Sequence, residues 1–137
     1  MSINYECVAA SSTVEGNECK RITSKGSAGS SWVSAGMFPQ ELVFRLRKKE
    51  SPTVCRVTSM NIREVQFYGC ADSTPRKWFR IQSEPSDRVD GERDETQDSK
   101  FRLDYEKGMK AAQFIKMVIV RGYGPFVSVS EVRFTSD

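Results

Sequence analysis

The sequence predicts an all-β fold, an antiparallel β-sandwich or jelly roll formed by a single domain. Apolar and polar residues alternate with a period of two in most segments, as in half-buried antiparallel strands. Stretches rich in Ser, Thr and Gly separate these segments, and no segment shows a convincing helical period. The 137 residues suit one domain with a sizeable core. Together these observations favour many short strands packed in two layers.

The predicted strands follow one another from the N-terminus. The alternating pattern is found at residues 3–9, 42–47, 64–67, 78–81 and 101–105. A more continuously apolar run at residues 114–120 predicts a central strand covered on both faces. Cys55 also lies in a strand-like segment.

The last strand contains an irregularity. Val127 and Val129 share one phase of the alternation, whereas Val132 and Phe134 share the other. A slip of one residue would turn the apolar side chains toward solvent unless a β-bulge absorbs it. We therefore predict a bulge next to Glu131 that redirects its side chain.

Two segments of the domain, which spans residues 1–137, lack a strand pattern. Residues 11–31 are rich in Ser, Thr and Gly, and residues 84–100 are rich in acidic residues. Both are predicted to be loops on the β scaffold. The acidic segment has neither the ligand spacing nor the flanking helices of an EF-hand. Trp32, at the end of the first loop, is predicted to plug the core and anchor that loop.

The charge balance excludes some partners. The chain has 21 basic and 18 acidic residues, a balance too even to indicate nucleic-acid binding. The basic residues 45–49 predict a solvated strand edge, with Lys48 and Lys49 entering a turn.

No apolar run approaches the ~20 residues of a membrane helix, so we expect no direct membrane insertion. The N-terminus lacks the basic and apolar regions of a signal peptide, which favours a cytosolic chain.

Catalytic chemistry is not visible in the sequence. The chain has no histidine, the commonest general base. It also lacks a nucleophile elbow and a phosphate-binding glycine loop. The four cysteines form no C-x-x-C pair, so we expect free thiols, with a structural disulfide as the alternative. The chain is therefore predicted not to be an enzyme.

The most specific pattern is Trp32 followed by the hexapeptide Gly-Met-Phe-Pro-Gln-Glu at residues 36–41. A second pattern is the apolar run 114–120 followed by residues 122–129, Gly-Tyr-Gly-Pro-Phe-Val-Ser-Val. With these residues the chain resembles the discoidin-like subunit "twenty-five" of the intraflagellar transport B complex, also called the small heat-shock-like protein B11 family. The resemblance spans most of the chain and is sharp in these two places.

This resemblance implies a discoidin-like jelly roll without enzymatic activity. It implies a stable heterodimer with the Rab-like small GTPase subunit "twenty-seven", docked onto coiled-coil subunits of the intraflagellar transport B complex. Such a protein supports cargo transport in the cilium or flagellum, and is also found in the cytoplasm and basal body region. Nothing resembles an α-crystallin domain, so no chaperone activity is expected.

The candidate partner-binding residues are Met37 and Phe38, beside Pro39, and Phe126 in a Gly-Pro turn. Exposed aromatic and apolar anchors of this kind are favoured at interfaces, and internal packing is the alternative for all three. A second function class also stays open: an intracellular module that binds glycans or lipid headgroups.

The resemblance also implies calcium, bound in that family through a pattern like Asp-Gly-x-x-x-Thr-x-Trp before the tryptophan. Here Gly26 and Ser30 match the pattern, but Lys25 occupies the aspartate position. Calcium takes about six to eight oxygen ligands, carboxylates among them. We therefore expect a degenerate metal site. Glu131 matches a position that offers a carboxylate in discoidin-like domains. Either a Lys25–Glu131 pair closes the loop without metal, or Lys25 points to solvent.

Overall fold

The computed structural model describes residues 2–22, 31–84, 89–105 and 111–136. Within these residues the chain forms strands and one short 3-10 helix, η1 (Cys19–Arg21). The strands are β1 (Ser2–Ile3), β2 (Tyr5–Ala10), β3 (Trp32–Val33), β4 (Gln40–Glu50), β5 (Val54–Met60), β6 (Ile62–Cys70), β7 (Phe79–Glu84), β8 (Thr96–Asp104), β9 (Ala112–Gly122) and β10 (Ser128–Thr135). No helix in these ranges is long and apolar enough to cross a membrane.

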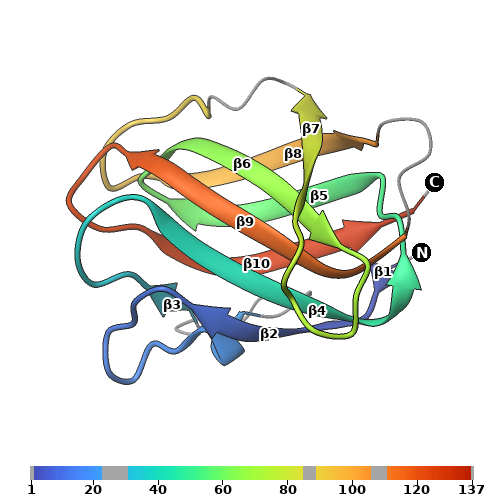
Figure 1. Ribbon diagram of the computed structural model, residues 1–137. Helices are drawn as coiled ribbons and strands as arrows, with labels where there is room; N and C mark the ends of the chain where they lie inside the picture. Colours follow the sequence, from blue (N-terminus) through green and yellow to red (C-terminus); the bar gives the residue numbers. More distant parts are fainter. Residues whose placement is uncertain (1, 23–30, 85–88, 106–110, 137) are drawn as a thin grey trace.

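The strands form two packed layers (Figure 1). One layer contains β1, β10, β5 and β8, and the other contains β2, β4, β9 and β6. Strand β7 pairs with both β6 and β8 and so connects the layers at one side. At the other side Asn4 separates β1 from β2, which belong to different layers. All of these pairings are antiparallel, and the predicted all-β sandwich is confirmed.

Three expectations for single elements are confirmed. In the pairing of β10 with β5, Val129 faces Ser59 and Glu131 faces Thr58, so Ser130 is the extra residue of the predicted bulge. Strand β9 has the predicted central position, between β4 and β6, but only one of its faces is fully covered, since Lys116, Val118 and Val120 on its outer face are half-buried. Trp32 is fully buried, and its indole N–H donates to the carbonyl oxygen of Ser12 at 2.9 Å.

The predicted loop at residues 84–100 is wrong at its C-terminal end, because β8 begins at Thr96. The first inward positions of this strand carry the polar side chains of Gln97 and Ser99, so no apolar alternation marks it. The buried amide of Gln97 accepts a hydrogen bond from the Ile62 N–H at 2.9 Å and donates to the Ile62 carbonyl at 2.8 Å. These bonds offset the cost of burying a polar side chain inside the sandwich.

The expected turn at Lys48 and Lys49 is also wrong, because β4 continues to Glu50. The pairing of β4 with β9 shifts register between Arg45 and Glu50, and Arg47 donates its N–H to the Asn4 carbonyl at 3.0 Å. The chain therefore stays extended where its side chains are solvated, as expected for cationic residues.

The core between the layers contains an aromatic cluster of Tyr5, Phe44 and Phe134. The ring centroids lie 5.3–5.6 Å apart in edge-on arrangements, which suit the quadrupoles of aromatic rings. The Tyr5 hydroxyl donates to the Val132 carbonyl at 2.5 Å. Burial is the main reason that the pKa of Tyr5 lies above its ordinary value, and the nearby Cys55 raises this pKa further.

Tyr5→Phe is expected to change both stability and its pH dependence. At neutral pH the variant should lose about 1 kcal/mol of unfolding free energy, because the hydrogen bond to Val132 is lost. The folded state favours the neutral Tyr5 phenol over the ionised form. The contribution of this phenol to the free energy of unfolding is therefore present below the unfolded pKa of about 10 and declines at higher pH. Above pH ~10 the stability of the variant should fall less steeply with pH than that of the parent chain.

Urea unfolding at neutral and alkaline pH measures both effects. Tyr68→Phe is the matched control, since the half-buried Tyr68 hydroxyl donates to the Gln66 side chain on the outer surface. Parallel pH profiles for the parent chain and Tyr5→Phe would contradict the expectation.

Candidate functional site

Four connections gather at one end of the sandwich, at the left of Figure 1. We call residues 34–39, 61–63, 89–95 and 122–127 the loop end. Tyr123 ties three of them together: its N–H donates to the Asn61 carbonyl at 2.8 Å, and its hydroxyl donates to the Val89 carbonyl at 2.6 Å. The fourth connection, residues 34–39, is bonded to residues 122–127 through Ser34, whose N–H donates to the Val127 carbonyl at 2.9 Å. The loop end is therefore one continuous surface.

Met37 is the most exposed large apolar side chain among the described residues, with 86% of its surface accessible. Gly36 precedes it with a φ of +100°, a left-handed conformation that glycine adopts without steric cost. Pro39 follows a cis peptide bond and lacks an N–H, and β4 starts immediately after it at Gln40. The local sequence thus turns the chain sharply and leaves the methionine outside.

The loop that carries Met37 is anchored by residues far away in the sequence. The Ala35 N–H donates to the Ser12 hydroxyl at 2.9 Å, and the Glu41 N–H donates to the Ser11 hydroxyl at 2.8 Å. Both hydroxyls in turn donate to the Gln40 side-chain oxygen. A loop held from both sides presents its exposed side chain with little ordering cost on binding.

Phe38 and Phe126 differ in their positions. Phe38 is half-buried against the core, and its ring covers Gly122 so closely that a Cβ there would lie 2.5 Å from the end of the ring. Phe126 follows Pro125 and is 38% exposed. Met37 and Phe126 are therefore surface residues of the loop end, whereas Phe38 packs against the core.

Asn61 is a residue of this site that sequence reasoning missed. It is fully buried with a φ of +69°, and its side-chain amide donates to the Asp94 carboxylate at 3.1 Å. Its side-chain oxygen accepts from the Asp94 N–H at 2.7 Å, and Asp94 is also left-handed, with a φ of +61°. The only available signal was an asparagine between two strand-like segments, since asparagine tolerates this conformation.

Asn61→Ala should therefore lower the unfolding free energy by about 2–4 kcal/mol, through two lost hydrogen bonds and a left-handed alanine. Urea unfolding followed by circular dichroism measures the change. Asn4→Ala, at an exposed position in the turn between β1 and β2, is the control and should stay within about 0.5 kcal/mol of the parent chain. An equal loss in both variants would contradict the role of Asn61.

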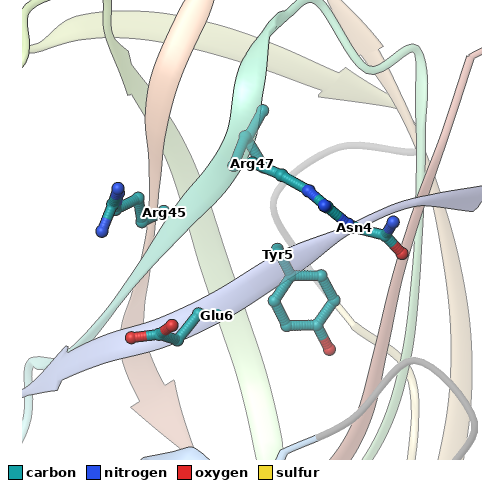
Figure 2. Close-up of a pocket in the computed structure, with 6 residues that line it drawn as sticks. Asn4, Tyr5, Glu6, Arg45 and Arg47 are labelled. Carbon is teal, nitrogen blue, oxygen red and sulfur yellow. The ribbon is translucent and has the colours of Figure 1, made fainter.

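Two shallow hollows lie outside the loop end. The first, of about 320 Å³, lies over β2 and β4 (Figure 2). In Figure 2 the side chains of Glu6 and Arg45 lie together at one side, and Arg47 extends toward Asn4 at the other. Glu6 and Arg45 are cross-strand neighbours in an exposed setting, where an ion pair contributes little. This arrangement offers surface charge without a buried acid, base or nucleophile.

The second hollow, of about 280 Å³, contains Glu131. The Glu131 carboxylate accepts hydrogen bonds from the Thr58 hydroxyl at 3.2 Å and from the Arg133 guanidinium at 3.3 Å. Arg56, Lys100 and a second carboxylate, Asp98, line the same hollow. Lys25, Gly26 and Ser30, named in the sequence analysis for the metal site, lie outside the described residues.

The described side chains of this hollow do not favour a calcium ion. Calcium needs several oxygen ligands with net negative charge, but Asp98 and Glu131 share the hollow with three cationic side chains, and Arg133 engages Glu131. Across the described ranges, no group of three or more Cys, Asp or Glu residues is arranged to hold a metal ion.

Isothermal titration of the full chain with calcium chloride should accordingly show no micromolar binding. Glu131→Gln should leave this result unchanged, since the carboxylate is expected to hold Arg133 and not a metal. Micromolar binding that Glu131→Gln or Ser30→Ala abolishes would contradict the expectation.

A comparison with curated proteins confirms the resemblance inferred from the sequence. The chain is 28% identical over 102 residues to "Intraflagellar transport protein 25" of Chlamydomonas reinhardtii, which corresponds to 74% of this chain and 49% of that protein. The chain thus aligns with about half the length of this relative. A scan against models of protein families gives no match.

Solved structures with the same discoidin-like fold include sugar-binding modules and a domain bound to another protein. The Clostridium perfringens module CpGH89CBM32-5, in complex with GalNAc-β-1,3-galactose, is similar with a TM-score of 0.78 and 17% identity over 99% of this chain and 100% of that one. Reduced XRCC1 bound to the DNA polymerase β catalytic domain has a TM-score of 0.76 and 16% identity over 100% and 99%. A chitosan-binding module of Paenibacillus sp. IK-5 has a TM-score of 0.71 and 19% identity over 98% and 95%. At these identities the likeness establishes the fold alone.

Proposed function

We propose that this chain is a non-catalytic subunit of the intraflagellar transport B complex. In this role it forms a heterodimer with a Rab-like small GTPase and supports cargo transport in the cilium or flagellum. The observation that carries the proposal is the sequence likeness to an intraflagellar transport protein over 74% of the chain. The fold alone does not decide the function, since its structural neighbours include sugar-bound and protein-bound domains.

The loop end is the surface we assign to the GTPase. Met37 and Phe126 are two of its exposed apolar side chains, and Phe38 in the same loop as Met37 packs against the core. A stable interface buries about 800 Å² on each partner, roughly a tenth of the 7713 Å² accessible on this chain. Interfaces combine an apolar centre with a polar rim, and the loop end also carries the exposed charged residues 92–95, which could supply such a rim.

The alternative function, binding of glycans or lipid headgroups, requires a different kind of surface. Small-ligand sites are concave, with a few converging polar groups. At the loop end the dominant feature is a methionine that is 86% exposed. A flexible apolar side chain held outward suits insertion into a partner protein better than enclosure of a sugar.

Affinity capture from ciliated cells tests the proposed function against this alternative. The tagged full chain should recover a Rab-like GTPase together with coiled-coil subunits of the intraflagellar transport B complex, from the cilium and the basal body region. The same protein should give no signal on an array of sugars and anionic lipids. Specific array binding without recovery of a GTPase would overturn the proposal.

A further inference from the structure

Two of the four cysteines lie close together in the structure. Cys7 lies on β2 and Cys19 lies on η1, and the Cys19 thiol donates to the Cys7 carbonyl oxygen at 3.6 Å. The Cys7 thiol itself donates to the carbonyl oxygen of Ala9 at 3.8 Å. The structure describes all four cysteines as free thiols.

Their accessibility differs in a useful way. Cys7 is only 5% exposed, whereas Cys19 is half-buried at the edge of the core. Cys55 and Cys70 are both fully buried. An oxidant in solution therefore meets Cys19 first, and the more buried Cys7 is the neighbouring cysteine that could resolve the product.

We propose that Cys7 and Cys19 form a reversible disulfide, with glutathione disulfide as the oxidant. The Cys19 thiolate attacks one sulfur of glutathione disulfide, which releases one glutathione thiolate and leaves glutathione bound to Cys19. The Cys7 thiolate then attacks the Cys19 sulfur and releases the second glutathione. The two cysteines together lose two protons and two electrons, and one glutathione disulfide becomes two glutathione molecules.

The elements that carry the two thiols allow this reaction. Disulfide sulfurs lie ~2 Å apart, so the Cys19 sulfur must move from its position at the Cys7 carbonyl oxygen to the Cys7 sulfur. Helix η1 has three residues and no side-chain N-cap bond, so a small shift disrupts few interactions. Burial and the neighbouring Cys19 raise the pKa of the Cys7 thiol, which makes the second attack the slower step.

The disulfide would change the surface that carries Met37. Residues 11 and 12 lie between the two cysteines, and their hydroxyls accept the N–H groups of Glu41 and Ala35 at 2.8 and 2.9 Å. The Ser12 carbonyl also accepts the Trp32 indole N–H at 2.9 Å. A displacement of η1 toward β2 is therefore transmitted to both ends of the loop at residues 34–39. This inference requires no partner protein and does not depend on the proposed function.

The test uses the full chain in glutathione buffers that range from reducing to oxidising. After alkylation and proteolysis, mass spectrometry should find a peptide with Cys7 linked to Cys19 and two fewer alkylated thiols per chain. Hydrogen exchange at residues 34–41 should differ between the oxidised and reduced forms. Cys19→Ser and Cys19→Ala should abolish both effects, and Cys70→Ser should retain both.

Three results would overturn the proposal. One is glutathione that stays on Cys19 without a link to Cys7. Another is a linked peptide that joins Cys19 residues of two chains. The third is unchanged exchange at residues 34–41 after the Cys7–Cys19 bond has formed, which would remove the effect on the Met37 loop.

Discussion

Trp32→Ala is expected to lower the unfolding free energy by about 3–5 kcal/mol, the largest stability change that we predict. The Trp32 side chain is fully buried, and its indole N–H holds the Ser12 carbonyl. The substitution therefore leaves a cavity in the core and releases the loop before β3. Domains of this kind have an unfolding free energy of only about 5–15 kcal/mol, so this substitution would remove a large part of it.

Trp78→Ala is the matched control for this prediction. The Trp78 ring is half-buried on the outer surface, where the Lys116 ammonium lies 4.5 Å from its centroid. Loss of this contact should cost about 1 kcal/mol. Urea unfolding with fluorescence of the remaining tryptophan measures both variants, and a smaller loss for Trp32→Ala than for Trp78→Ala would contradict the role of Trp32 as the core plug.

The double variant Met37→Asp/Phe126→Asp is expected to weaken binding of the Rab-like GTPase by at least about 100-fold. Apolar anchors at the centre of an interface contribute about 2 kcal/mol or more when truncated. Two carboxylates would in addition be desolvated against an apolar partner surface. Both positions are exposed, so the fold should be unaffected.

Val8→Asp is the control for the binding measurement. Val8 is 41% exposed, similar to Phe126, but it lies on β2 outside the loop end. Calorimetry with the purified GTPase should give the parent affinity for Val8→Asp. If the double variant kept the parent affinity, with circular dichroism like that of the parent chain, the GTPase would have to bind another face of the domain.

The fold could be predicted from the sequence because period-two alternation depends only on which side chains face the core. The bulge followed from the same rule, since Val129 and Val132 cannot both face inward in a regular strand. The start of β8 could not be predicted, because Gln97 faces inward as a polar residue. Its hydrogen bonds to Ile62 become visible only when β6 is next to it in space.

The candidate site was predicted less completely. Met37 and Phe126 could be chosen because neighbouring Gly and Pro residues interrupt the strand pattern and leave them in turns. The inward position of Phe38 depends on the missing side chain at Gly122, which is 84 positions away in the chain. Asn61 and Asp94, and likewise Cys7 and Cys19, are brought together only by tertiary structure. No local pattern contains that information.

Co-expression of the two chains is the decisive test of the proposed heterodimer with a Rab-like small GTPase. One partner carries an affinity tag, and the eluted complex is analysed by size exclusion with light scattering. We expect the two chains to elute together at near-equal stoichiometry, and we expect Met37→Asp/Phe126→Asp to separate them. Separate elution of the two unmodified and folded chains would contradict the proposed heterodimer.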